Sequence, residues 1–324
     1  MAQTIKTKLL KTGMLYFVMI LFLGVITFSC KPKVNVPNTV AAPLVVSPDS
    51  LTVKPWLYAY IVEKDIPIKA YFRYMDSVAR VYDTLVAYHL TAHIIVRTNP
   101  WILDTLVSTD YYNQRKKGVF IYDQKEFVAL KKGDTLYMPT DTIANQIIEK
   151  QAETVLDVNI PEMKLRVIEG SDTVGTFLVR VGQNRINQWA NYEKMSKLRT
   201  KTGSGKIIHT YFKSAYLDPV TGQTHDKTKR DDGDSTFMAL MPWLEPQING
   251  ENFGQLIHPT TNENTLGKAY SNGCIGVGEG DMWRVYYYAP IGTRVRIRYN
   301  LNVKDDEGRP IRLKDIYGKK PKVG

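Results

Sequence analysis

Cysteine, histidine and long apolar runs are all scarce in this sequence of 324 residues. The two cysteines, Cys30 and Cys274, allow one disulfide at most. Only five histidines are present, and His89 and His93 lie four residues apart with no third ligand candidate nearby, which argues against a zinc site. Neither a calcium-loop spacing nor a dinucleotide-binding glycine pattern occurs. We therefore expect no metal and no cofactor.

Low-complexity tracts are absent, and acidic residues are outnumbered by basic ones. Apolar residues make up 44% of the chain and charged residues 23%, which is typical of a folded protein. The formal net charge of +11 suits an anionic partner, such as lipid headgroups, cell wall or a substrate that bears carboxylates. No RNA- or DNA-binding motif is present, so nucleic acid is not expected as a partner.

The one long apolar run, residues 14–28, follows three lysines at the N-terminus. This arrangement is typical of a secretory signal, and the run is shorter than the roughly 20 residues of a membrane-spanning helix. It ends in Ser29 and Cys30, which resemble the lipobox of bacterial lipoproteins, where the signal is removed and the cysteine carries lipid. An uncleaved N-terminal anchor is the alternative. Either way, the rest of the chain is expected outside the cytoplasm.

Acylation of Cys30 would leave Cys274 without a disulfide partner. A leftover cysteine in an exported protein is either buried and inert or a reactive thiol. Removing the signal with its three lysines lowers the net charge from +11 to +8. By the lipoprotein sorting rule, an acidic residue after the cysteine often retains the protein in the inner membrane. Lys31 stands there, so we expect attachment to the outer membrane of a Gram-negative bacterium, with the body in the periplasm.

Composition and periodicity divide the chain into five consecutive parts. These are a signal peptide (1–29), a lipid-anchored tether (30–54), a small α+β domain (55–150), a β-rich domain (151–300) and a basic C-terminal tail (301–324).

Residues 55–150 show helical and extended patterns in turn. Apolar positions from Tyr71 onward recur at helical spacing, and Pro100 suits the first turn of a second helix. Residues 118–124 and 134–139 have the composition of short strands. Segment 97–140 resembles a LysM-type peptidoglycan-binding module, with a plain structural α+β domain as the alternative.

From residue 155 onward the pattern is that of β-structure. Residues 164–182 alternate apolar and polar positions around a turn, which predicts a hairpin. A helix is predicted from Asp281, as its cap, to Pro290, and the charged stretch 225–235 is predicted to be a solvated loop. Further strands are predicted at 206–212, 254–259 and 292–299.

Cys274 lies in the glycine-rich stretch AYSNGCIGVGEGD, sixteen residues after His258. A thiol becomes a strong nucleophile when an imidazole takes its proton and the ion pair holds the thiolate. Gly273 permits a tight turn, and successive N–H groups in such a turn can point at one oxyanion. By the Cys–His pair alone, a buried inert cysteine is the better-supported interpretation.

The stretch from 254 to 297 resembles the catalytic end of the L,D-transpeptidase (YkuD) family. The family pattern is a histidine, about fifteen residues, Ser-X-Gly-Cys, an acidic residue and a Gly-Thr-X-Val strand. The matching positions here are His258, Ser271, Gly273, Cys274, Asp281 and 292–295. The resemblance covers about residues 155–300. It implies a β-rich catalytic domain, a β-sandwich or barrel with one helix after the cysteine, preceded by the small α+β domain.

The resemblance implies cysteine-dependent acyl transfer on peptidoglycan tetrapeptide stems. Cys274 would be the nucleophile and His258 the general base, followed by acid toward the leaving D-alanine amine. Backbone N–H groups of Asn272, Gly273 and Cys274 would stabilise the oxyanion, and Ser271 would shape the turn. The acyl group would pass to a second stem, giving a 3→3 cross-link, or to a lipoprotein amine.

One position departs from the family pattern. The family usually has arginine two places after the cysteine, and this chain has Gly276. We consider Arg284 and Lys268 as substitutes, and Tyr270 as a residue that lines the substrate cleft. Two alternatives stay open: an L,D-carboxypeptidase, in which water replaces the acceptor amine, and a catalytically inactive lipoprotein that binds the wall.

The lipobox resemblance generates the first prediction. Metabolic labelling with a clickable fatty acid should place label on the wild-type protein and none on Cys30→Ala. Cys274→Ser is the matched control and should keep the label. Label on the Cys30→Ala protein would rule out Cys30 as the acylated residue.

Overall fold

The computed structural model describes residues 54–188, 195–218, 221–305, 307–318 and 322–323. The predicted signal peptide, Cys30 and all but the last residue of the predicted tether lie outside these ranges. Within the described ranges, no helix is both long and apolar enough to cross a membrane.

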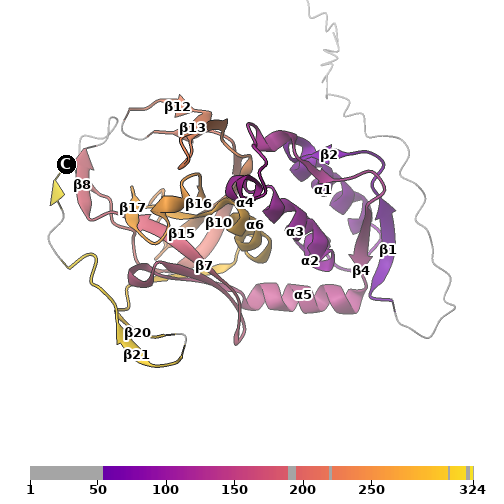
Figure 1. Ribbon diagram of the computed structural model, residues 1–324. Helices are drawn as coiled ribbons and strands as arrows, with labels where there is room; N and C mark the ends of the chain where they lie inside the picture. Colours follow the sequence, from indigo (N-terminus) through magenta and orange to yellow (C-terminus); the bar gives the residue numbers. More distant parts are fainter. Residues whose placement is uncertain (1–53, 189–194, 219–220, 306, 319–321, 324) are drawn as a thin grey trace, which may run out of the picture. The chain divides into compact units, whose positions relative to one another are not determined.

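Over residues 56–153 a group of helices lies between two pairs of short strands in the sequence, and a further helix follows (Figure 1). The helices are α1 (Ile68–Asp83), α2 (Ala92–Thr98), α3 (Pro100–Ser108), α4 (Tyr111–Lys116), α5 (Asp141–Glu153) and the 3-10 turn η1 (Gln124–Glu126). The strands are β1 (Trp56–Ile61), β2 (Ile66–Pro67), β3 (Val128–Leu130) and β4 (Thr135–Pro139). β1 pairs with β4 and β2 with β3, both antiparallel.

Most of the local predictions for this region are confirmed. α1 buries Tyr71, Met75 and Tyr82 on one face, as the spacing predicted, and Pro100 opens α3 at a position that needs no N–H. The strand predicted at 118–124 is wrong, because this segment runs as turn and coil. Phe120 is 47% exposed there, so its apolar side chains do not belong to a sheet face.

Residues 155–298 form a closed mixed β-barrel. The strands are β5 (Val155–Asn159), β6 (Lys164–Glu169), β7 (Asp172–Gly182), β10 (Gly203–Lys213), β15 (Met241–Ile248), β16 (Ile257–Thr260), β17 (Ala269–Ser271), β18 (Ile275–Gly278) and β19 (Arg294–Arg298). Their order is β17-β7-β18-β16-β15-β10-β19-β5-β6, and an additional β6–β7 pairing closes the ring. The β-rich fold class and the hairpin at 164–182 are therefore confirmed.

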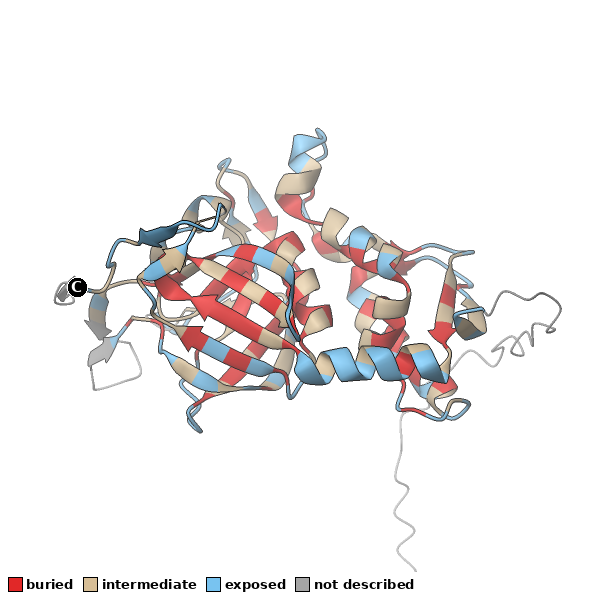
Figure 2. Ribbon diagram, turned by 90° about the horizontal axis from the view of Figure 1, so that it is seen from below, coloured by how far each residue is buried: buried red, intermediate tan, exposed pale blue. Residues whose placement is uncertain are grey.

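Alternation along the barrel strands builds the core. In β19, Val295 and Ile297 are buried while Arg294 and Arg296 face solvent, as predicted. Figure 2 shows the same alternation of buried and exposed positions across the other barrel strands, and it shows α5 as largely exposed.

Helix α6 (Glu279–Tyr288) follows β18 directly and is the only long helix of the described part of residues 155–318. Met282, Trp283 and Val285 are fully buried, and α6 packs against α2, α3 and β15. The predicted cap is wrong, because the helix begins two residues before Asp281 with Gly278 as its N-cap. Asp110 supplies the capping oxygen instead, since its Oδ2 accepts the N–H of Gly280 at 2.8 Å.

Between β10 and β15 the chain forms two small hairpins, not the solvated loop predicted for 225–235. The strands are β11 (Tyr216–Leu217), β12 (Thr224–His225), β13 (Lys227–Lys229) and β14 (Ser235–Phe237). Arg230, at the β13–β14 turn, is 3% exposed and donates to Glu279 Oε1 at 2.8 Å. A residue of a charged stretch can thus be buried when it pairs with an opposite charge in the folded protein.

Within the stretch predicted as a basic tail, β20 (Asn302–Lys304) and β21 (Pro310–Arg312) form a hairpin. Tyr317 then returns to the barrel, where its hydroxyl donates to Gly182 O at 2.5 Å and accepts from Thr200 N at 3.3 Å. The remaining short elements are β8 (Arg185–Gln188), β9 (Met195–Lys197), β22 (Lys322–Val323), η2 (Ile160–Glu162) and η3 (Glu263–Thr265).

The buried Arg230–Glu279 pair generates a stability prediction. Arg230→Ala leaves a carboxylate uncompensated in the interior, so the free energy of unfolding should fall by about 3–5 kcal/mol. The exposed pair Arg309–Glu307, with side chains 70% and 66% exposed, is the matched control, and Arg309→Ala should cost about 0–1 kcal/mol. Urea titration followed by tryptophan fluorescence measures both. Equal losses for the two variants would contradict the prediction.

Candidate active site

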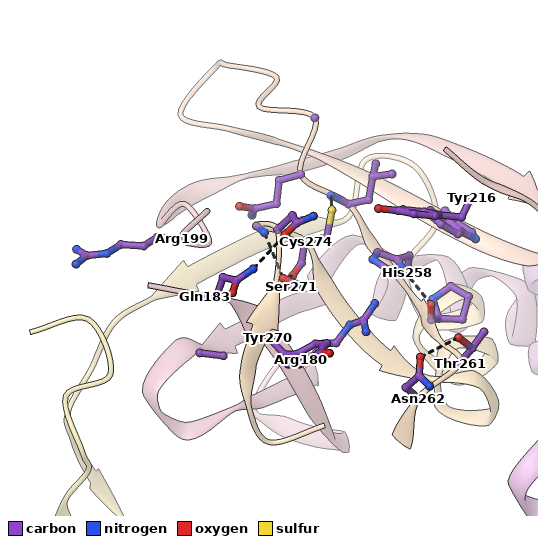
Figure 3. Close-up of a pocket in the computed structure, with 18 of the residues that line it drawn as sticks. Arg180, Gln183, Arg199, Tyr216, His258, Thr261, Asn262, Tyr270, Ser271 and Cys274 are labelled. Carbon is purple, nitrogen blue, oxygen red and sulfur yellow. Dashed lines mark hydrogen bonds between the residues drawn. The ribbon is translucent and has the colours of Figure 1, made fainter. Parts of the chain in front are cut away.

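The barrel brings His258 and Cys274 to one face of the sheet. β16 and β18 are parallel neighbours, and His258 is the register partner of Gly276. Cys274 lies two residues before Gly276, so its side chain is expected on the same face as that of His258. Both residues line a cavity of about 1660 Å³. Figure 3 shows the sulfur of Cys274 and the imidazole of His258 among the side chains that line this cavity.

The imidazole of His258 is held in one tautomer. Its Nδ1 lies 2.8 Å from the carbonyl oxygen of Pro259, which can only accept, so Nδ1 carries the proton and Nε2 is left with a lone pair. The ring of Trp243 stacks on it with centroids 4.5 Å apart. Burial, and then the positive charge of Arg180, lower the pKa of His258 to about 3. His258 is therefore a neutral base at neutral pH.

Cys274 is partly exposed at the cavity wall, and its Sγ accepts the backbone N–H of Leu256 at 3.5 Å. Desolvation raises the pKa of the Cys274 thiol, and this effect outweighs the N–H of Leu256 and the charge of Arg180. The raised pKa of the thiol and the lowered pKa of the imidazole both disfavour the expected ion pair and favour a neutral thiol beside a neutral imidazole.

The turn before Cys274 is stabilised by hydrogen bonds of the Ser271 side chain. Ser271 Oγ donates to the carbonyl of Cys274 at 2.5 Å and accepts the N–H of Gly273 at 3.2 Å. Gly273 has φ +117°, a conformation that an L side chain rarely adopts. The N–H of Gly273, one of the three predicted oxyanion donors, thus has an acceptor within the turn, and the N–H groups of Asn272 and Cys274 stay predicted donors.

Sequence reasoning assigned no role to Thr200, which anchors this turn from outside. Its hydroxyl donates to the carbonyl of Gly273 at 2.9 Å and accepts the N–H of Gly182 at 2.8 Å. Gln183 adds a second tie, because its Nε2 donates to the side chain of Asn272 at 3.2 Å. The contact of Thr200 with Gly273 depends on the fold of the barrel, because the two residues are 73 positions apart in the sequence.

The cavity is strongly basic. Asp315 is the only acidic residue among the described residues that line it. The basic side chains of its wall are Arg180, Arg185, Lys197, Arg199, Lys201, Lys213, Lys227, Lys229 and Lys314. A cavity with this surplus of positive charge favours a ligand that carries several carboxylates.

Of the three residues considered for substrate contact, one lines the cavity and two do not. Tyr270 lines the cavity and is 61% exposed. Lys268 is not among the lining residues, and Arg284 lies 3.7 Å from Asp104 of α3, also outside the lining. Arg180 of β7, which sequence reasoning did not single out, lines the cavity beside Cys274. The departure at Gly276 was the signal that could have prompted a search for such an arginine.

Comparison with known proteins finds one family model that matches the barrel. Residues 153–297 match the YkuD family model, described as the L,D-transpeptidase catalytic domain. No curated protein matches the chain.

Two solved structures are similar. One is an L,D-transpeptidase from Xylanimonas cellulosilytica, with 12% identity, a TM-score of 0.33 and coverage of 74% of this chain and 97% of that chain. The other is L,D-transpeptidase 3 from Mycobacterium tuberculosis in complex with a faropenem-derived adduct, with 15% identity and a TM-score of 0.31. That match covers 45% of this chain and 60% of the Mycobacterium chain.

The neutral resting pair generates a prediction about pH. The pKa of the Cys274 thiol is raised, so its alkylation by iodoacetamide should still be rising above pH ~8.5, where a free cysteine is half ionised. His258→Ala should leave this alkylation profile nearly unchanged, because a neutral imidazole does not hold the thiolate. Cys274 alkylation followed by mass spectrometry from neutral to alkaline pH measures both. A wild-type midpoint near neutrality that rises in His258→Ala would restore the ion-pair interpretation.

Proposed function

We propose that the YkuD domain formed by residues 153–297 makes this chain a cysteine-dependent peptidoglycan L,D-transpeptidase that acts on tetrapeptide stems. One observation carries the proposal. Cys274 and a neutral, tautomerically defined His258 face the same basic cavity from adjacent strands of that domain. A stem peptide carries several carboxylates, which complement the cavity wall.

The first half-reaction follows from the protonation states. His258 Nε2 takes the proton of the Cys274 thiol as the sulfur attacks the carbonyl carbon at the L-centre of the donor stem. The oxyanion that forms is stabilised by backbone N–H groups of the turn, with that of Cys274 among them. The intermediate then collapses, the carbon–nitrogen bond to D-alanine breaks, and His258 returns its proton to the leaving amine. The product is a thioester on Cys274.

The second half-reaction reverses these roles. The amine of an acceptor stem gives a proton to His258 and attacks the thioester, the carbon–sulfur bond breaks, and the thiol is restored. The new amide is a 3→3 cross-link. A lipoprotein amine can serve as acceptor in the same way, and water in place of the amine gives carboxypeptidase activity. We further propose that a lipid on Cys30 holds the chain at the periplasmic face of the outer membrane, close to this substrate.

The experiment uses purified protein and disaccharide-tetrapeptide, with products identified by mass spectrometry. We expect cross-linked dimers from the wild type and none from Cys274→Ala. His258→Ala should turn over roughly 10²–10⁴-fold more slowly, because it loses the positioned base. Lys268→Ala, outside the cavity, is the matched control and should retain wild-type turnover.

The other outcomes separate the alternatives. Tripeptide without dimers would identify a carboxypeptidase, and no product would favour a wall-binding scaffold. Preincubation with a carbapenem should block turnover and add the mass of one adduct at Cys274, because a β-lactam presents a strained carbonyl to the same nucleophile. An adduct of equal yield on Cys274→Ala would exclude Cys274 as that nucleophile.

A further inference from the structure

Arg180 occupies the space beside Gly276, the position at which the sequence departs from the family pattern. β7 and β18 are antiparallel neighbours, and Arg180 is the register partner of Gly276. A Cβ built on Gly276 would lie 2.5 Å from Arg180 Nε, 2.6 Å from its Cγ and 3.0 Å from its Cδ. The arginine side chain therefore lies directly across the glycine, and any larger residue at 276 would displace it.

The register places Arg180 in a row with the reactive groups. His258 faces Gly276 from one side, and Arg180 faces Gly276 from the other, so all three belong to one line across the sheet. The positive charge of Arg180 acts on both groups: it adds to the lowering of the His258 pKa by burial, and it partly offsets the desolvation that raises the pKa of Cys274. Figure 3 shows the guanidinium between Tyr270 and His258, on the cavity side of the strands.

The guanidinium has no carboxylate to neutralise it within the described residues, where no ion pair of Arg180 is found. Its Nη1 donates to the hydroxyl of Thr265 at 3.4 Å, and its buried Nε has no hydrogen-bond partner in that part of the chain. Burial raises the pKa of the neighbouring Cys274 thiol, which favours its neutral form. A partly buried cation with an unused donor and no counter-ion is well suited to bind an anion.

We propose that Arg180 binds a carboxylate of the substrate beside Cys274, in place of an arginine at position 276. Gly276, which has no side chain, leaves the space that the Arg180 side chain occupies. This role rests on the proposed function for the identity of the substrate. Its chemistry is independent of that identity, since any acyl compound with a carboxylate near its reactive carbon should be favoured. Arg180 is thus a specificity-determining residue supplied from a neighbouring strand.

Two alkylating agents of similar size test this directly. Iodoacetate carries a carboxylate and iodoacetamide does not, and both alkylate the sulfur with loss of iodide. The rate ratio of iodoacetate to iodoacetamide at Cys274, divided by the ratio for free cysteine, measures the preference for the anion. Peptide-level mass spectrometry of the full chain restricts the readout to Cys274.

We expect the wild type to prefer iodoacetate and Arg180→Gln to lose this preference by roughly tenfold, as removal of a charge-assisted hydrogen bond predicts. Arg180→Lys should retain part of it. Lys213→Gln is the matched control, because Lys213 also lines the cavity and its charge reaches Cys274. That variant should change the ratio much less than Arg180→Gln does.

Gly276→Ala tests the second half of the proposal. Its methyl group displaces the arginine, so the preference for iodoacetate should fall in the wild-type background. The same change should have no effect in Arg180→Ala, whose side chain no longer lies across position 276. Thermal melting confirms that each variant is folded before its ratio is used.

Equal slowing of both reagents in Arg180→Gln would overturn the proposal, because it would mean that Arg180 acts on the thiolate alone. An unchanged ratio in folded Arg180→Gln would also overturn it, since it would leave Arg180 with a packing role. The alkylation assay needs no peptidoglycan turnover. The alkylation assay can therefore support the anion site even if the transpeptidase assay gives no product. Conversely, rejection of the anion site would leave the result of the product assay unchanged.

Discussion

The parallel pairing of β16 with β18 is the constraint on which the rest of the site depends. It aligns His258 with Gly276 and thereby sets Cys274 and the base on one face of the sheet. Both are inner strands of the sheet, since β7 pairs with β18 on one side and β15 with β16 on the other. A one-residue slip would turn His258 to the opposite face and separate it from the thiol.

Support for this pairing comes from both ends of the chain. From the N-terminal side, Asp110 caps α6, and the buried hydroxyls of Tyr71 and Tyr287 lie 2.7 Å apart, so the helix that follows β18 is anchored to the α+β part. From the C-terminal side, Tyr317 ties Gly182 to Thr200, which in turn holds the carbonyl of Gly273. The cysteine turn is thus held by Thr200, 73 residues from Gly273 along the chain, and the helix after it by Asp110, 170 residues from Gly280.

Local patterns were enough to predict much of this molecule. Alternation in β19 and the 164–182 hairpin, helical spacing in α1 and the position of Pro100 all correspond to forces that act within a few residues. The pairing of His258 with Cys274 was reached through the family resemblance. What could not be predicted depends on partners distant in sequence. Asp110, and not the predicted Asp281, caps α6, and Arg230 is buried because it pairs with Glu279.

The place of Arg180 in the site also could not be predicted from local sequence patterns. Its alternating position in β7 has no feature that distinguishes it from other arginines of the strands, and only the register with Gly276 reveals its place. The thiol pKa is another case, because spacing identifies a cysteine and a histidine but does not report how much water surrounds them. Desolvation of both groups decides their protonation states here.

The proposed mechanism, in which the nucleophile rests as a protonated thiol, has a consequence for the durability of the protein. Oxidants attack the thiolate far faster than the thiol, and the first product, a sulfenic acid, would end acyl transfer. The cavity that desolvates Cys274 therefore also shields it chemically between encounters with substrate. His258 can deprotonate the sulfur when a carbonyl is in place to receive it. The site thus exposes its most oxidisable form only for the lifetime of a productive collision.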